Sequence, residues 1–329
     1  MNLIPYTKPY LAVPDQVRLL QARGMFISDQ LKAETCLHRI GYYRLSGYAY
    51  PFRHREITRN FDGGTTEHIH EHFRPGTEFA HIMALYVFDK KLRLLLLDAI
   101  ERVEVGLRVE IALLLGLRDP FTHLDPRNFN RYFSTPNKLG GQTPHAIFLE
   151  KLDAAFQRSR EEFAEHFKNK YESKLPIWMS IELWDFGTLS AILSGMQASD
   201  LTLLGLQYQL PRRVFLPSWA QSINFVRNIC AHHGRLWNRA LVQQPIPSRP
   251  GEISLLEHLS FDLHAQRRLY AVAAVLQYLL RFIHPSSSWG MRFAEHLATF
   301  PTSQHISLRQ LGIPHGSDEL TLWRSKDCR

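Results

Sequence analysis

Cysteine is scarce in this chain, and its few positions exclude two kinds of cross-linked protein. The sequence of 329 residues contains three cysteines, Cys36, Cys230 and Cys328. They are odd in number, lie far apart and show none of the paired spacings of a disulfide framework or a thiolate zinc site. Because few, unpaired cysteines are typical of proteins from reducing compartments, we expect a cytoplasmic protein.

The chain also lacks the long apolar runs of membrane proteins. Its most apolar stretch, residues 271–280, is much shorter than the roughly 20 residues needed to span a bilayer, and arginines flank it. The first six residues have neither the basic nor the apolar region of a signal peptide. We therefore predict that no membrane is among the partners of this protein.

The signature motifs of nucleotide-driven and metal-driven enzymes are missing as well. The sequence has no G-x-x-x-x-G-K-[ST] loop, no G-x-G-x-x-G after a strand, no H-E-x-x-H and no G-x-S-x-G. One histidine-rich segment, residues 67–72, would place alternate imidazoles on one face of a strand, where they could hold a metal. No second ligand cluster follows and the segment is loop-like, so we predict neither a metal nor a cofactor.

The chain is rich in positively charged residues and in hydrophobic residues. It carries 39 Lys and Arg against 31 Asp and Glu, a net charge of +8, with 17 further histidines. This balance suits a polyanionic partner such as RNA, DNA or a lipid surface. With 45% hydrophobic residues the chain can build a substantial core, which excludes a disordered protein.

Helical periodicity dominates the sequence and alternating strand patterns are scarce, so the predicted fold is all-α. The longest helical pattern starts at Thr77, and its apolar residues recur at three- and four-residue steps over 82–114. This pattern has two interpretations: the apolar residues form the protomer's own core, or they form a helix seam between protomers. Other helices are expected from Pro14, from an N-cap at Ser28 to Ile40, and over 143–171, 218–234 and 260–283.

Two segments with turn-forming residues divide the chain into three predicted parts. Residues 61–75, with glycines near both ends, are expected to be a flexible connector, and residues 245–250 form a linker rich in proline and serine. We accordingly predict an N-terminal helical and aromatic extension over 1–75. A helical core over 76–244 and a C-terminal helical extension over 245–329 follow it.

The most informative segment is Arg227-Asn228-Ile229-Cys230-Ala231-His232. On a helix with about 100° per residue, its polar side chains share an arc of roughly 140° with Asn224 and Arg235. The apolar residues fall on the opposite arc, and the polar arc contains nothing acidic. Permanent cations, amides and a titrating imidazole on one face predict an anion site that includes an acid/base group. A solvated polar helix face is the alternative interpretation.

Further cations surround this motif in the sequence or in the predicted bundle. Gly234 is the expected helix stop, and Arg235, Asn238 and Arg239 follow it around Trp237, a residue of the buried type. Other candidates for RNA contact are two arginines of the long helix and an aromatic segment in which arginine alternates with tyrosine. These candidates are Arg93, Arg102, Tyr42, Tyr43 and Arg44. A packing role is the alternative interpretation of the tyrosine-rich segment.

This residue set suits metal-free acid/base chemistry on a phosphodiester. Arginine can hold the phosphate and its developing charge, and histidine can move the proton of a 2′-hydroxyl or of the leaving oxygen. One motif supplies a single histidine, whereas such cleavage is easier with both a base and an acid. A two-fold dimer that places two motifs together would furnish both, so we expect a homodimer.

The motif and its surroundings resemble a known family. Arg227, Asn228 and His232, read as R-N-x-x-x-H, resemble the R-x4–6-H motif of the HEPN superfamily, and segments over roughly 15–245 are similar to AbiD/AbiF-type abortive-infection proteins. These segments are 42–52, Asp89 with 92–93, 175–178, 186–190, 218–228 and 235–239. The resemblance implies a HEPN-like helical bundle and metal-independent RNA cleavage in phage defence or a toxin–antitoxin system. It also implies a dimeric site and control by an antitoxin such as a non-coding RNA.

By position, the resemblance makes Arg227 and His232 the catalytic pair and Asn228 the polar residue beside the arginine. We expect Asn228 to orient His232 from one helical turn away. A non-catalytic protein that binds or senses a structured RNA is the alternative. It draws on the same positive charge and on the aromatic segment at 42–52.

Overall fold

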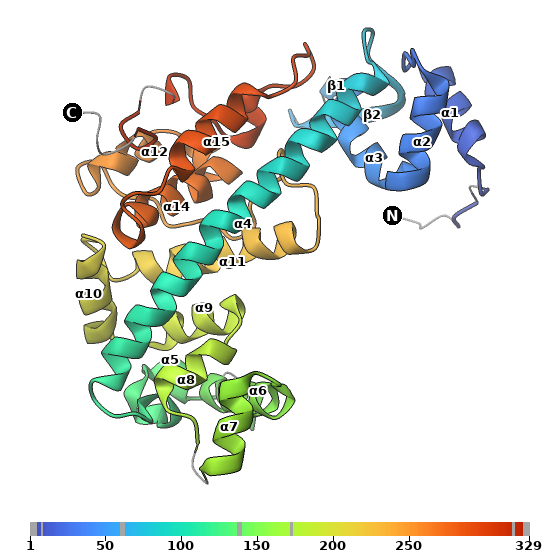
Figure 1. Cartoon of the computed structure of the whole chain (residues 1–329). Coiled ribbons are helices and arrows are strands. Elements are labelled where there is room, and N and C mark those ends of the chain that lie inside the picture. Colours follow the sequence, from blue (N-terminus) through green and yellow to red (C-terminus); the bar gives the residue numbers. More distant parts are fainter. Residues whose placement is uncertain are drawn as a thin grey trace. The chain divides into compact units, whose positions relative to one another are not determined.

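The structure, a computed structural model, describes residues 5–7, 9–59, 63–136, 140–171, 174–317 and 320–324. It is predominantly α-helical, as the sequence predicts, with one two-stranded sheet among these residues (Figure 1). The third cysteine, Cys328, lies outside the described residues. The chain divides into two compact units. Unit 1 comprises 1–92 and 296–310, and unit 2 comprises 93–295 and 311–329.

The elements follow one another in this order along the chain. Unit 1 begins with α1 (Val13–Ala22), α2 (Gln30–Ile40), α3 (Tyr42–Ala49), the 3₁₀ turn η1 (Tyr50–Phe52), β1 (Arg53–Arg59) and β2 (Thr65–Phe73). Next is α4 (Phe79–Gly116), which contributes to both units. Then come η2 (Thr122–Leu124), η3 (Pro126–Asn128), α5 (Arg131–Ser134), α6 (Pro144–Arg158), α7 (Glu162–Lys170), α8 (Ile177–Ser180), η4 (Ile181–Leu183), α9 (Phe186–Gly195) and α10 (Ala198–Gln207). The last elements are α11 (Phe215–Ala231), η5 (Ser254–Leu256), α12 (Glu257–Ser260), α13 (Leu263–Gln266), α14 (Leu269–Ile283), α15 (Trp289–Ala298) and η6 (Leu308–Leu311). The predicted division at 75/76 and 244/245 stays a prediction.

The expected flexible connector over 61–75 is wrong for most of its length, because Thr65–Phe73 is strand β2. It pairs in antiparallel register with β1, with Arg55 opposite Ile69, and an irregularity follows Arg53. Nearly every residue of the two strands is exposed, so the hydrophobic alternation that reveals a half-buried strand is absent from the sequence. Cross-strand pairs stabilise the hairpin instead, including Arg55 with Glu67 at 2.8 Å.

In unit 1, the N-cap of α2 lies one residue later than predicted. Asp29, and not Ser28, is the N-cap, because its carboxylate accepts a hydrogen bond from the Lys32 backbone N–H at 2.9 Å. Gly41, with a φ of +91°, ends the helix as predicted. Tyr48 of α3 donates to the buried Asp89 of α4 at 2.6 Å.

The apolar seam of α4 is the protomer's own core. Ile82, Leu85, Leu92, Leu96 and the apolar residues that follow at helical spacing to Ile111 are buried. The helix is apolar on more than one side, however, and it leaves Val105, Val109 and Leu113 exposed. The alternative of a seam between protomers therefore does not apply to the buried face.

Two predicted long helices are each broken in unit 2. The segment over 143–171 forms α6 and α7, because the chain turns at Ser159, whose carbonyl accepts from the Lys168 ammonium at 2.9 Å. The segment over 260–283 begins with the last residue of α12 and then forms α13 and α14, and the Arg268 backbone is extended between these two helices. The Arg268 guanidinium donates to the Asn238 carbonyl at 2.7 Å. This hydrogen bond connects the break at Arg268 with the segment that follows the motif.

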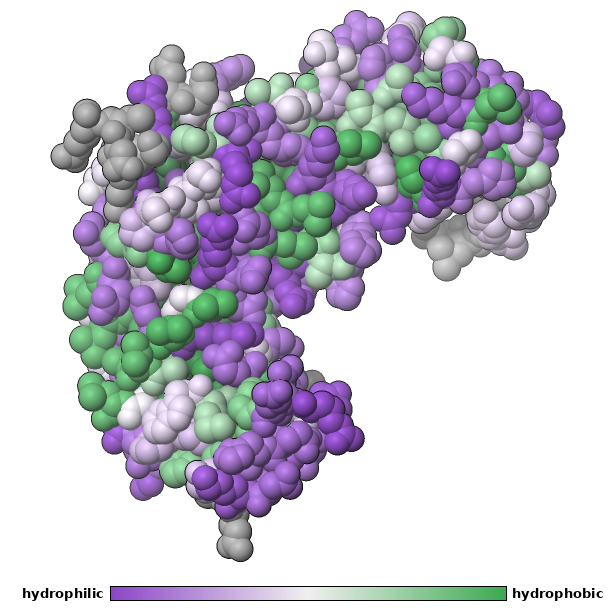
Figure 2. All heavy atoms as spheres, in the orientation of Figure 1, coloured by the Kyte–Doolittle hydropathy of each residue, from purple (hydrophilic) through white to green (hydrophobic). Residues whose placement is uncertain are grey.

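The core of unit 2 is built around α14, in which every residue from Leu269 to Leu280 is buried. Helix α11 packs against α9 and α14, and its Trp219 lies edge-on to Tyr278. On the face shown in Figure 2, hydrophilic residues cover α7, and a hydrophobic area lies over α10, where Leu203 and Leu206 are exposed. In the described parts of the chain, no helix combines the length and the apolarity that a membrane span requires.

Candidate functional site

The motif lies at the C-terminal end of α11, which closes in a tight hydrogen-bonded turn. The helix ends at Ala231, three residues before its predicted end, so His232 is the C-cap residue. The His233 N–H donates to the Cys230 carbonyl at 3.1 Å and the Gly234 N–H to the Ile229 carbonyl at 2.8 Å. These two bonds form a Schellman motif, with His233 as its left-handed residue at a φ of +56°. The turn carries His232 out of the helix and into solvent.

The turn is tightly packed and is held against α4 by a hydrogen bond. A Cβ at Gly234 would lie 3.1 Å from Ile229 Cγ2, closer than an ordinary van der Waals contact, so a side chain there would displace Ile229. The Gly234 carbonyl accepts a hydrogen bond from the Arg93 guanidinium of α4 at 3.2 Å. Arg93 is only 5% exposed. The structure therefore gives Arg93 a supporting position beneath the motif, where the sequence suggested a surface that faces RNA.

The three motif side chains are accessible from solvent. Arg227 is half-buried, whereas Asn228 and His232 are exposed. The Arg227 guanidinium lies 3.4 Å from the Asn228 side-chain oxygen, a long and therefore weak hydrogen bond. The Asn228 carbonyl accepts the His232 backbone N–H at 3.0 Å. This is the last i→i−4 bond of the helix and fixes the His232 backbone; the expected orientation of the His232 imidazole by the Asn228 side chain stays a prediction.

The opposite face of α11 is buried as the periodicity predicts. Trp219, Ile223, Val226, Ile229 and Cys230 are all less than 9% exposed. Polar residues of the motif consequently cannot turn inward without exposing this apolar face to water. The amphipathic pattern thus determines which side of the helix a ligand can reach.

Two carboxylates from other elements lie close to Arg227, and sequence reasoning missed both. Burial raises the pKa of Glu104 on α4 more than the charges of Arg108 and Arg227 lower it. Burial also acts to raise the pKa of Asp185, but hydrogen bonds from Thr188 and the charges of Lys151 and Arg227 outweigh it, and the pKa is lowered. The charge of Arg227 is therefore partly balanced in the free protein. No pattern along the chain connects 104, 185 and 227, so only the fold could reveal this arrangement.

The residues after the turn extend the site. Leu236 and Trp237 are buried, as predicted for the tryptophan, while Arg239 is exposed and Arg235 and Asn238 are half-buried. The Arg239 guanidinium lies 3.7 Å from the position a Gly234 Cβ would take. Arginines 227, 235 and 239 thus belong to one end of α11 and the segment that follows it.

The other predicted contacts are placed elsewhere. Arg102 of α4 donates to Asp98 at 3.0 Å and to Ser287 at 3.2 Å, so its guanidinium is already engaged within unit 2. Tyr42, Tyr43 and Arg44 lie on α3 in unit 1, whereas the motif belongs to unit 2. Tyr42 accepts a hydrogen bond from Arg23 at 3.0 Å, and Tyr43 is 91% exposed. Tyr43 is therefore the aromatic ring of this segment that is most accessible to a ligand.

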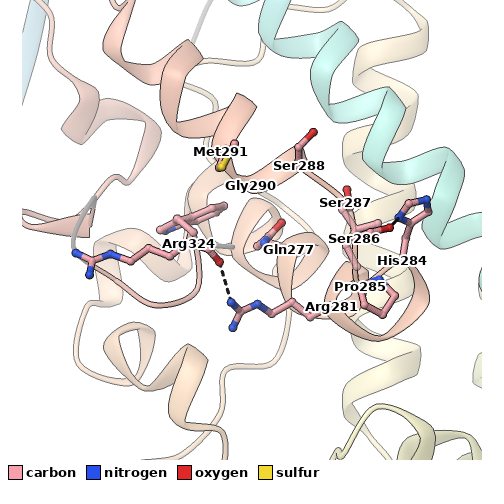
Figure 3. A pocket seen from close by; sticks show the side chains of 12 residues that line it. Gln277, Arg281, His284, Pro285, Ser286, Ser287, Ser288, Gly290, Met291 and Arg324 are labelled. Atoms are coloured by element: carbon pink, nitrogen blue, oxygen red, sulfur yellow. Dashed lines mark hydrogen bonds between the residues drawn. The ribbon is translucent and has the colours of Figure 1, made fainter. Parts of the chain in front are cut away.

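Other side chains that could bind a ligand or react lie apart from the motif. A cavity of about 230 Å³ between α14 and α15 contains Arg281, His284 and three serines (Figure 3). Its Arg281 donates to the carbonyls of Thr321 and Arg324 at 3.0 and 2.9 Å, so backbone oxygens already occupy the guanidinium. In the histidine-rich hairpin, His70 pairs with Glu56 at 3.2 Å. Throughout the described ranges, no three His, Cys, Asp or Glu residues gather as a metal site would require.

The fold and the site define a predominantly helical protein that presents an arginine, an amide and a histidine at one exposed helix terminus. A protein-family model described as "Abi-like protein" matches residues 35–238, which is more than half of the chain. The chain therefore belongs to the Abi-like protein family. Among curated proteins and among solved structures, no significant match was found.

Proposed function

We propose that this protein is a metal-independent endoribonuclease of the HEPN type that acts in abortive infection. Membership of the Abi-like family associates the chain with that phage-defence response. The observation that carries the catalytic proposal is the solvent-accessible set of Arg227, Asn228 and His232 at the end of α11. An R-N-x-x-x-H segment buried in the protomer's interior would have pointed to a purely structural role.

In this mechanism the RNA supplies its own nucleophile. A base removes the 2′-hydroxyl proton, the 2′-oxygen attacks the adjacent phosphorus, and the bond to the 5′-oxygen breaks as an acid protonates it. Arg227 holds the phosphate and its growing negative charge, and His232 moves one of the two protons. The products are a 2′,3′-cyclic phosphate and a 5′-hydroxyl, so atoms and charge balance without a cofactor.

The second proton-transfer group comes, we propose, from a second protomer. The R-N-x-x-x-H motif supplies one histidine, His232, whereas this cleavage is easier with both a base and an acid. A two-fold dimer would oppose two Arg227 and two His232 side chains across one cleft. RNA is then the substrate and also connects the two protomers. A structured non-coding RNA is an antitoxin that such a basic cleft would bind.

The decisive experiment is cleavage of single-stranded RNA by the purified protein in EDTA. We expect fragments that end in 2′,3′-cyclic phosphate, with cleavage lost in Arg227→Ala and His232→Ala. His38→Ala, which removes an exposed histidine of α2, is the matched control and should cleave normally. Equal cleavage by His232→Ala and wild type would overturn the proposal.

A growth experiment connects the chemistry with the cell. Wild-type protein expressed in bacteria should arrest growth, and Arg227→Ala should relieve the arrest at equal protein level. RNA that co-purifies with the wild type, together with no cleavage under any condition, would instead establish a non-catalytic RNA-binding protein. In that case His232→Ala should bind RNA as tightly as the wild type does.

A further inference from the structure

A cavity of about 360 Å³ lies beside the motif helix, among α5, α6, α9 and α11. Its apolar wall includes Phe148, which is buried, and Tyr132, which is 64% exposed. Its polar groups include the ammonium of Lys151, the hydroxyls of Thr188 and Ser194 and the amide of Gln221. This volume and this mixture of aromatic and polar groups are typical of a site for a small ligand.

The cavity and the motif are parts of one surface of unit 2. Gln221 lies seven residues before Asn228 on α11, so the two exposed amides share a helix face about 10 Å apart. Gly187 lines the cavity, and a Cβ placed there would lie 3.3 Å from an Asp185 carboxylate oxygen and 3.7 Å from the Asn224 amide nitrogen. Asp185 and Asn224 thus form the boundary between the cavity and Arg227.

The polar groups of the cavity are held in place before any ligand binds. The Gln221 amide donates to the Ser194 hydroxyl and accepts from the Gln243 amide, each at 2.9 Å. Thr188 is fixed by its backbone N–H, which donates to Asp185 at 2.6 Å in the N-cap of α9. Fixed donors and acceptors beside an aromatic ring are what recognition of a nucleobase edge and face requires.

We propose that this cavity is a nucleobase subsite that takes one unpaired base of an RNA whose phosphate lies at Arg227. The inference rests on the proposed function in one respect, namely that RNA is the ligand of the motif. Tyr132 stacks on the base, Gln221 and Thr188 bind its edge, and Lys151 contacts a flanking phosphate. The substrate class is accordingly single-stranded RNA, because a base paired in a duplex cannot enter a cavity of this kind.

The test uses a steric block and a matched control. Ala191 is an exposed residue of α9 that lines the cavity, so Ala191→Leu fills it. Ala198→Leu, at an exposed alanine on α10, adds the same side chain outside the cavity. Both are made in His232→Ala protein, so that cleavage does not consume the probe. The probes are an eight-nucleotide single-stranded RNA and its variants with an abasic ribose at each position in turn.

We expect one abasic position to weaken binding about tenfold in the His232→Ala background, as the loss of one stacked base does. Ala191→Leu should weaken binding of the intact RNA by about the same factor and should abolish the further effect of that abasic position. Ala198→Leu should bind within twofold of its parent. Tyr132→Ala, at a solvent-facing ring, should lower affinity in the same direction and guards against misfolding of the leucine variant.

The outcomes separate this subsite from the proposed catalysis. Equal affinities of Ala191→Leu and Ala198→Leu, with every abasic RNA bound alike, would overturn the subsite even if the wild type cleaves RNA through His232. Coupling between the block and one abasic position, without cleavage by the wild type, would retain the subsite and overturn the ribonuclease. Failure of every probe to bind would reject the subsite, and the cleavage assay would then decide the function alone.

Discussion

Gly234 completes the motif turn, and a side chain there would be crowded by Ile229. A Cβ there would meet Ile229 Cγ2 at 3.1 Å and the Ile229 carbonyl oxygen at 3.3 Å. Gly234→Ala should therefore lower the free energy of unfolding by about 1–3 kcal/mol, measured by urea denaturation. Gly205→Ala in α10 is the matched control, because its Cβ would meet only ordinary contacts at 3.7 Å and alanine favours a helix. Equal stabilities of the two variants would contradict this reasoning.

Asp185 has two roles, and a second helix cap provides the comparison that separates them. It caps α9, and its negative charge lies close to Arg227. Asp185→Ala should lower stability by about 1 kcal/mol through loss of the cap. At low salt it should also raise RNA affinity, because a charge that competes with phosphate is removed.

The matched control for Asp185 is Asp29→Ala in unit 1. Asp29 caps α2 through the Lys32 N–H, so its loss should lower stability to a similar extent and leave RNA affinity unchanged. Binding is measured by fluorescence anisotropy at two salt concentrations. A gain of affinity in both variants, or in neither, would show that Asp185 does not act on the motif.

At the scale of elements, α4 supports the end of α11. The buried Arg93 donates to the Gly234 carbonyl, which lies outside the hydrogen-bonded ladder of the helix. Arg93→Met should release the turn, because loss of a charge-assisted hydrogen bond costs about 1.5–3 kcal/mol. Hydrogen exchange at the His233 and Gly234 amides should then accelerate more than exchange in α14.

Arg102→Met is the control on the same helix. The Arg102 guanidinium donates to Asp98 and Ser287, whereas that of Arg93 donates to the motif turn. Loss of Arg102 should leave exchange at His233 and Gly234 unchanged, and RNA cleavage should persist. If exchange at the turn were the same in the two variants, Arg93 would be a general core residue without a specific effect on the motif.

For the whole molecule, buried histidines set the stability in acid. Burial, and next the charge of His145, lower the pKa of His123 to about 4, against about 6.5 in the unfolded chain. The stability that neutral His123 contributes is full above pH 6.5 and is lost as the pH falls toward 4. This group alone should lower the free energy of unfolding by about 3 kcal/mol between pH 7 and pH 4.

His123→Phe should therefore reduce the acid sensitivity measured by urea denaturation across that range. Burial also lowers the pKa of His258 to about 4. His258 still contributes acid sensitivity in this variant, so the sensitivity should decrease without disappearing. His38→Phe alters an exposed histidine and should leave the pH profile unchanged. An unaltered profile in His123→Phe would show that this side chain does not titrate on unfolding.

Assembly is the second property of the whole molecule. Two Arg227 side chains about 8 Å apart repel by roughly 2 kcal/mol at an effective dielectric near 20, and Glu104 and Asp185 of each protomer offset part of that repulsion. We expect a dimer in sedimentation velocity that RNA or phosphate tightens and that weakens at low salt without them. Asn228→Arg should weaken it further, whereas Gln157→Arg on α6 should not. A monomer under all these conditions would defeat the composite site.

The amino-acid sequence by itself determined the helical class, the apolar face of α11, the burial of Trp237 and the residues of the motif. All of these depend on local periodicity and residue type, which one stretch of chain contains. It could not predict the hairpin at 53–73, since both strands are exposed and lack alternation. Nor could it place the breaks at Ser159 and Arg268. The Ser159 carbonyl contacts Lys168 of the next helix, and the Arg268 guanidinium contacts Asn238.

The surroundings of the motif were decided by tertiary structure alone. Glu104, Asp185 and Lys151 come from three separate elements. The charges of Glu104 and Asp185 interact with Arg227, and that of Lys151 with Asp185, over distances that only packing creates. The same packing buries Arg93 beneath the turn and forms the cavity beside Gln221. Electrostatic and steric effects act through space, so residues far apart in the sequence shape a site that the sequence shows only as a motif.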